Sequence, residues 1–156
     1  MPRTKLDIFM GTTAAPVHQS MGEITRVLVK AGATSISTVY GGRGEITGMN
    51  FVIPMGKTAY PYVLPVRVEA LYQKINGIRV RRASDHEEED RKRAERIAWR
   101  QLLRWVEAQM ALVDTGMVEV KEVFLPYCVD RNGKSFFQIF IENEKKMLGA
   151  GTGGGI

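Results

Sequence analysis

Four arginines are spaced so that a helix would hold them in one row. Their separations of three, four and four residues place them on one helical face: Arg93, Arg96, Arg100 and Arg104. Guanidinium groups stay charged at any physiological pH and bind phosphate oxygens through paired hydrogen bonds. The row therefore predicts a surface for a polyanion such as nucleic acid. The alternative is a solvated helix face, of which the favourably ordered pair Glu89 and Arg93 is an example.

Two other groups of residues could contact nucleic acid. One is a basic segment before the predicted helix, with Arg79, Arg81 and Arg82, which would either follow a sugar-phosphate backbone or only solubilise the chain. The other is Tyr60 and Tyr62, which share one face of a predicted strand and could stack on unpaired bases. Packing of both rings beneath the long helix is the favoured alternative, because aromatic residues at strand spacing usually belong to a core.

The acidic residues near His86 give only a weak metal or catalytic signal. Asp90 follows His86 by four residues, a spacing that two metal ligands on one helix share. Acidic residues in a first helical turn are, however, expected from the helix dipole alone. His18 is isolated, and Cys128 has no nearby basic residue to activate its thiol. The sequence therefore predicts a protein that is not an enzyme, with no catalytic residue, bound metal or cofactor.

The element that must position the arginine row is one long helix over residues 85–115. Ser84 and Glu87 form a capping box at its start, and no proline or glycine interrupts it before Gly116. At 1.5 Å per residue it would be about 45 Å long. Its second half is apolar over a wide arc, which is typical of the central helix of a core.

Alternating residues in the preceding third of the chain predict a three-stranded antiparallel β-meander. The strands cover residues 35–40, 46–53 and 58–64, and glycine-containing turns separate them. One face of the middle strand carries larger apolar residues than the other, so that face is the better candidate for covering by helices. Pro61 has no amide hydrogen for a strand ladder, which places the third strand at an edge of the sheet.

Two shorter helices are predicted beside the meander. A capping box of Ser20 and Glu23 predicts a helix start, and Gly32 is the type of residue that ends a helix in a left-handed conformation. Pro65 predicts the opening of a second helix that stops at residues 76–77, an Asn-Gly pair.

Toward the two ends of the chain, the sequence predicts shorter and less regular elements than in its centre. Residues 1–18 form a predicted N-terminal arm that packs only in part. Residues 118–129 indicate a short turn or strand, and residues 130–134 indicate an Asn-Gly turn. The next segment is predicted to be an amphipathic helix that continues through Met147. The glycine-rich residues 149–156 are predicted to be a flexible tail. The α+β domain is thus expected over residues 19–148.

Composition limits the function classes. A chain of 156 residues with 25% charged residues has the size and polarity of one globular domain. The single cysteine excludes an intramolecular disulfide framework, no apolar run reaches membrane-spanning length, and the N-terminus lacks a signal peptide, so a cytoplasmic location is expected. The net charge of +5 weakly favours an anionic partner.

Three short motifs resemble a family of small proteins encoded by bacteriophages and prophages. They are A-E-R-I-A-W-R at residues 94–100, W-V-E-A-Q at residues 105–109 and E-V-F-L-P-Y at residues 122–127. The resemblance covers about residues 16–140 and includes a meander that ends in a Leu-Pro step, here at residues 64–65. It implies a phage origin and the host-cell cytoplasm, but it transfers no activity and no functional residue.

The predicted order of elements, a meander followed by a long basic helix, also resembles the core of phage single-strand annealing proteins. Those proteins form rings or filaments that hold single-stranded DNA in a basic groove between sheet and helix. Topology alone does not establish function.

The sequence therefore predicts an α+β fold, a three-stranded antiparallel β-meander packed against a long central helix and shorter helices. The leading hypothesis is a DNA-binding phage protein that is not an enzyme and forms homo-oligomers. It would bind single-stranded nucleic acid during annealing or recombination. The alternative is a structural or protein-interaction module of a phage assembly, which self-associates or binds a phage or host protein through apolar residues such as Trp105, Phe124 and Phe136.

Overall fold

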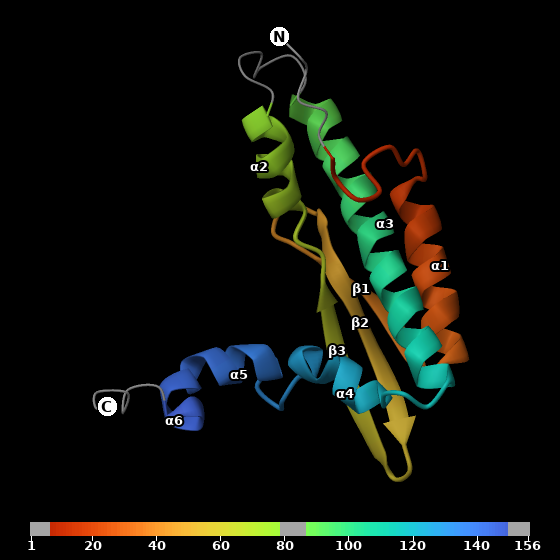
Figure 1. Cartoon of the computed structure of the whole chain (residues 1–156), viewed down its shortest axis with the longest axis vertical. Coiled ribbons are helices and arrows are strands. Elements are labelled where there is room, and N and C mark those ends of the chain that lie inside the picture. Colours follow the sequence, from red (N-terminus) through yellow and green to blue (C-terminus); the bar gives the residue numbers. More distant parts are fainter. Residues whose placement is uncertain (1–6, 79–86, 150–156) are drawn as a thin grey trace.

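The computed structural model describes residues 7–78 and 87–149 and has an α+β fold. Figure 1 shows the elements in chain order: α1 (Val17–Lys30), β1 (Ser35–Tyr40), β2 (Ile46–Met55), β3 (Thr58–Pro65), α2 (Val68–Ile78), α3 (Glu87–Asp114), α4 (Val120–Phe124), the 3₁₀ turn η1 (Leu125–Tyr127), α5 (Phe136–Glu142) and α6 (Glu144–Leu148). In the part of the chain described, no helix combines the length and apolar character needed to cross a bilayer.

The sheet is the predicted antiparallel meander, with strand order β1-β2-β3. In its register Met49 of β2 lies opposite Thr38 of β1 and Leu64 of β3. Gly44 and Gly56 in the two connecting turns have φ values of 78° and 62°, which residues with a side chain rarely adopt. The glycine positions thus set where the chain reverses and which face each strand residue occupies.

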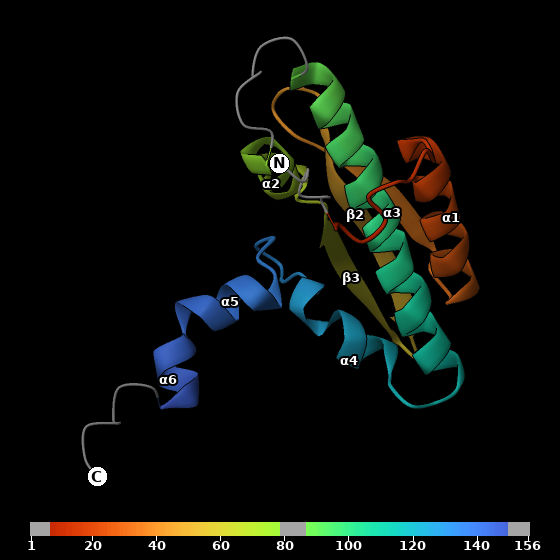
Figure 2. The same ribbon diagram turned by 45° about the horizontal axis from the view of Figure 1, so that its top comes forward.

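One face of the sheet is covered by helices, as the alternation of β2 predicts. Met49, Phe51 and Ile53 are each at most 2% exposed. They form a single core with residues of α1 and α3, including Leu28 and Leu103. Figures 1 and 2 show α1 and α3 side by side on this face, and the other face of the sheet lies open.

An aromatic cluster attaches the segment after α3 to this core. Phe124 at the end of α4 is fully buried and packs against Phe51, Tyr62 and Trp105, with ring centroids 5.2 to 5.7 Å apart. The prediction of a turn or strand over residues 118–129 is wrong for most of this segment, because Phe124 can reach the core from a short helix. Only its end pairs with the sheet, where the Val129 amide donates to the Pro61 carbonyl.

The start of α1 corrects the predicted capping box. The helix begins at Val17, one turn earlier than predicted, with Pro16 at the N-cap in an extended conformation. Proline already has the φ required there, and its carbonyl accepts from the amides of Gln19 and Ser20. Ser20 is therefore a buried residue inside the helix and does not cap it. Gly32, with φ of 103°, follows the end of the helix as predicted.

The two helices that flank the undescribed residues 79–86 differ in how well they were predicted. The long helix matches α3, which ends just before Gly116, although its expected cap at Ser84 lies outside the described residues. The predicted stop at residues 76–77 is wrong, because α2 continues to Ile78. The last turn is held by Ile75, which is 2% exposed and packs with Ile97 in a second, smaller core.

The predicted C-terminal helix is two helices, α5 and α6, separated at Asn143. The Asn143 side-chain amide donates to the Ile139 carbonyl at 2.8 Å, and its backbone has φ of −118°, which ends the regular helix. Both views show α5 and α6 projecting away from the sheet and the other helices (Figures 1 and 2). We call residues 136–148 the C-terminal arm.

Candidate functional site

Arg100 is not available to a phosphate. The residue is 5% exposed, and its Nη1 donates to a carboxylate oxygen of Glu23 on α1 at 2.8 Å. Removing a guanidinium group from water is costly unless a carboxylate and hydrogen bonds replace the water. The assignment of Arg100 to nucleic-acid binding is therefore wrong, because its charge is already used to join two helices.

Glu23, which sequence analysis placed in a capping box, is instead the partner of this arginine. A hydrogen bond from the Gln19 amide and the neighbouring Arg100 guanidinium hold the pKa of the Glu23 carboxyl below its ordinary value, against the effect of partial burial. Arg104, one turn further along α3, adds to the same field. Arg100 and Arg104 thus both act on a carboxylate of α1.

The other members of the row are placed differently from one another. Arg93 is half-buried and donates to the Gly11 carbonyl at 3.2 Å, which fastens the N-terminal segment to α3. Arg104 is exposed but pairs with Glu107 at 2.8 Å. Arg96 is half-buried and has neither a hydrogen bond nor an ion pair among the residues that the structure describes. The predicted continuous open row of unpaired charges does not form.

The two tyrosines do not provide a stacking surface. Tyr62 is 1% exposed and stacks on Phe51 at 5.2 Å, so its assignment to nucleic-acid binding is wrong and the core alternative is confirmed. Burial raises the pKa of its phenol to about 12. Tyr60 lies on the same helix-facing side, is half-buried, and has the Lys121 ammonium 5.3 Å from its ring centre. Neither ring is open on both faces to a base.

Several predicted residues are not tested. Arg79, Arg81 and Arg82, together with His86, lie outside the described residues. Within residues 7–78 and 87–149, no three His, Cys, Asp or Glu side chains gather closely enough to hold a metal ion. Cys128 is half-buried, and burial raises the pKa of its thiol.

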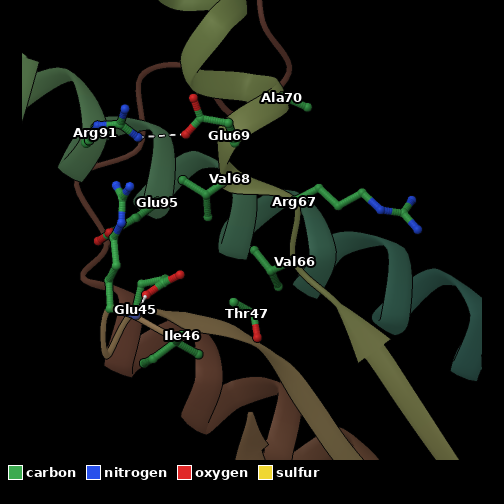
Figure 3. A pocket seen from close by; sticks show the side chains of 11 residues that line it. Glu45, Ile46, Thr47, Val66, Arg67, Val68, Glu69, Ala70, Arg91 and Glu95 are labelled. Carbon is green, nitrogen blue, oxygen red and sulfur yellow. Dashed lines mark hydrogen bonds and ion pairs between the residues drawn. The ribbon is translucent and has the colours of Figure 1, made fainter. Parts of the chain in front are cut away.

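A cavity of about 620 Å³ lies where the β1–β2 turn meets α2 and α3 (Figure 3). Its charged lining contains both signs, and Arg91 is paired with Glu69 at 2.7 Å and lies over the Tyr72 ring. The Arg91 hydrogen bond is the main reason that the pKa of the Glu69 carboxyl is lowered. Figure 3 shows the Arg67 side chain extending away from the cavity. Because its arginines are balanced by glutamates, this cavity does not have the net positive charge that an anion site needs.

The C-terminal arm carries apolar side chains that the described residues leave uncovered. None of the residues in α5 or α6 is buried. The most exposed apolar members show 45% to 63% of their surface, namely Phe136, Phe137, Ile141, Met147 and Leu148. An exposed apolar patch of this kind marks a surface that another partner covers. Phe136 was predicted as an interaction residue, whereas the equally predicted Phe124 is a core residue.

The uncovered side of the sheet, which we call the open sheet face, carries no charged residue. Its members alternate with the core residues along the strands: Ser35, Ser37, Val39, Gly48, Asn50, Val52, Pro54, Ala59, Pro61, Val63 and Pro65. All of these except Gly48 keep part of their surface exposed. About a quarter to a third of an ordinary protein surface is charged, so a charge-free face of this extent is typical of a contact surface. In the sequence, the signal for this face was that uncharged residues such as serine, valine and proline occupy every second position of the strands.

A hollow of about 430 Å³ connects the open sheet face to the base of the arm. Val63 and Pro65 line it from the sheet, Tyr127 from η1, and Phe137 and Gln138 from α5. Arg67, which is exposed, also lines this hollow. The open sheet face and the arm therefore adjoin, with one charged side chain at their junction.

The three motifs at residues 94–100, 105–109 and 122–127 have structural roles. Trp99 and Arg100 are buried residues of α3, and Phe124 lies in the aromatic cluster. They account for the core and its helix pairing and identify no ligand. Comparison with protein-family models, curated proteins and solved structures finds no match to this chain.

Proposed function

We propose that this protein is a non-enzymatic structural module of a phage assembly that self-associates through its C-terminal arm. The observation that carries the proposal is that two consecutive helices with large apolar side chains contain no buried residue. Helical stability in water normally comes from packing an apolar face, so short helices of this kind are expected to bind a partner. The resemblance to phage proteins supports the biological setting.

The rest of the molecule supplies a rigid support for this arm. The Ser135 hydroxyl accepts from the Gln138 amide at 3.2 Å, and the Gln138 side chain accepts from the Ser135 amide at 2.9 Å, which closes a capping box at the start of α5. The Lys134 ammonium, before the helix, pairs with the carboxylate of Glu142, the last residue of α5, at 3.0 Å. The proposal assigns no catalytic step to any residue.

Light scattering coupled to size exclusion tests the proposal on the intact chain. The wild-type protein is expected to self-associate as concentration rises, and Ile141→Glu is expected to abolish association because it places a charge in the apolar surface of the arm. Met117→Glu is the matched control, since Met117 is 71% exposed but lies outside the arm. The proposal is contradicted if wild type stays monomeric at all concentrations, or if both variants behave alike.

Binding of single-stranded nucleic acid is a second candidate function, with a smaller set of residues. Among residues 7–78 and 87–149, Arg93 donates to the Gly11 carbonyl and forms no ion pair, and Arg96 forms no ion pair either, so no described acid neutralises these two charges of α3. Together with Arg79, Arg81 and Arg82, they are the residues to which we assign phosphate contacts in this candidate.

Fluorescence anisotropy with a labelled oligonucleotide tests the second candidate. Binding is expected to weaken steeply as salt rises, because phosphate contacts release counterions. Arg96→Glu should reduce the affinity, whereas Arg104→Glu should change it less because Glu107 already pairs with Arg104. Absence of salt-sensitive binding by the wild-type chain eliminates this candidate.

A further inference from the structure

We propose that the C-terminal arm of one molecule packs on the open sheet face of a second copy, and that the second copy returns the same contact. This inference rests on the proposed function, because it names the surface on which the same arm packs. It is carried by the direction of the arm, the chemistry of the sheet face, and the size of the surfaces that would meet.

The direction of the arm is set at its base. The Asp130 carboxylate accepts from the amides of Asn132 and Lys134 at 2.8 and 2.9 Å, which closes the turn before α5. The Phe136 amide then donates to the Cys128 carbonyl at 2.9 Å. With Val129 bonded to β3, the arm starts at the sheet edge and extends away from its own sheet (Figure 2). It would have to break these bonds to cover that sheet.

The chemistry of the open sheet face fits an apolar helix. Pairing an apolar arm with charged residues would leave those charges without water, which is costly. The face offers Val39, Val52 and Val63 with small or uncharged neighbours, so the arm can cover it without burying a charge. On the arm, the charged Glu144, Lys145 and Lys146 lie in α6 and remain able to face solvent.

The dimensions also agree. The arm consists of two short helices, α5 of seven residues and α6 of five, which are about 10 Å and about 8 Å long at 1.5 Å per residue. Three strands about 4.8 Å apart make a face about 14 Å wide, which is wide enough for one helix with its side chains. A helix layer on a sheet is a standard way to cover its apolar face.

The area argues for a reciprocal contact. A large apolar side chain presents about 150–250 Å², so the five most exposed ones of the arm, each about half exposed, offer on the order of 450 Å². One arm on one face would then bury about 900 Å² in total, which is below the range of stable interfaces. Two reciprocal contacts would bury about 1,800 Å², which is within it, and they fit the two-fold symmetry usual for dimers.

Mixing two variants that fail for different reasons tests the inference. Ile141→Glu damages only the arm, and Asn50→Glu damages only the open sheet face, where Asn50 is exposed. Each variant alone is expected to be monomeric in sedimentation velocity. An equimolar mixture is expected to associate only at higher concentration than wild type, since one intact arm meets one intact face and this single contact buries only about 900 Å². Circular dichroism on each variant confirms that both are folded.

Other outcomes separate this inference from the proposed function. If Ile141→Glu is monomeric but Asn50→Glu associates like wild type, the arm binds elsewhere, so this inference is overturned while the proposed function stands. If both variants are monomeric and their mixture shows no association even at concentrations far above those at which wild type dimerises, the contact between arm and open sheet face is overturned. A wild-type chain that never associates contradicts both.

Discussion

Arg100 keeps a permanent positive charge where almost no water reaches it, because Glu23 lies 2.8 Å from its Nη1. Arg104, one turn away on the same helix, has the same chemical type and a carboxylate at the same distance, but it is exposed. The difference between the two residues is therefore solvent access. It predicts a difference in stability that charge counting alone would miss.

Replacing each of these arginines by alanine should separate the two roles. We expect Arg100→Ala to lower the free energy of unfolding by about 2–3 kcal/mol, somewhat less than for a fully buried pair because Glu23 retains some water contact. Arg104→Ala is expected to cost about 1 kcal/mol or less, as exposed ion pairs do. Urea unfolding measures both. Equal losses in the free energy of unfolding would show that the Arg100–Glu23 pair stabilises the fold no more than an exposed ion pair does.

The Glu23 carboxyl predicts a pH dependence. Because its pKa is lowered in the folded protein, it stabilises the fold above its unfolded pKa, and this stabilisation is lost as pH falls through the folded value. The Glu23→Gln variant cannot titrate at this position. The stability advantage of wild type over Glu23→Gln should therefore be present at neutral pH and shrink as pH falls below the ordinary glutamate pKa of about 4.3. Denaturant midpoints across this pH range check it, and an advantage independent of pH would contradict it.

At the scale of elements, the short helix α4 depends on one side chain. Phe124 is fully buried and touches rings from β2, β3 and α3. It thereby fixes η1 and the bridge from Cys128 to Tyr62, and these position the base of the arm. The packing of Phe124 in the core thus helps to set the direction of the exposed C-terminal arm.

Phe124→Ala should lower the free energy of unfolding by about 3–5 kcal/mol, because it removes a large buried ring and leaves a cavity. Phe136→Ala is the control, since Phe136 is also aromatic but 45% exposed in the arm, and its cost in the monomer should be small. Thermal unfolding of both variants at low protein concentration provides the comparison. A small effect for Phe124→Ala would mean that α4 is not a part of the core.

Elements with strong local signals could be predicted from the sequence. The meander follows from alternation and from glycines at positions of positive φ, and α3 follows from a long uninterrupted helical pattern. The apolar run around Phe124 has no clear period, so its helical form was missed. The break at Asn143 was missed because a single side-chain hydrogen bond to Ile139 decides it.

The candidate site was harder to predict because it depends on contacts between distant residues. Arg100 and Glu23 are 77 residues apart, and only the packing of α1 on α3 brings them together. Helical spacing correctly put the arginines on one face, but it does not reveal which element that face meets. The strand alternation shows which residues share the charge-free face, but that this face and the arm are uncovered follows only from the placement of the helices on the opposite side of the sheet.

At the scale of the whole molecule, the structure consists of a well-packed body and an arm that leaves it. The body has two adjoining cores and holds the N-terminal segment through Arg93 and through Gln101, whose side chain donates to the Phe9 carbonyl. The arm adds no buried residue to either core. A molecule of this shape is suited to assembly, in which one copy completes the packing of another.

Hydrogen exchange of the wild-type chain at low and high protein concentration tests this account most directly. Short exposed helices open easily, so the amides of residues 136–148 should exchange fast in the dilute protein. At high concentration the arm and the flanking strand edges of the open sheet face should both become protected, while α3 stays unchanged. Exchange of the arm that is equally fast at both concentrations would contradict the account.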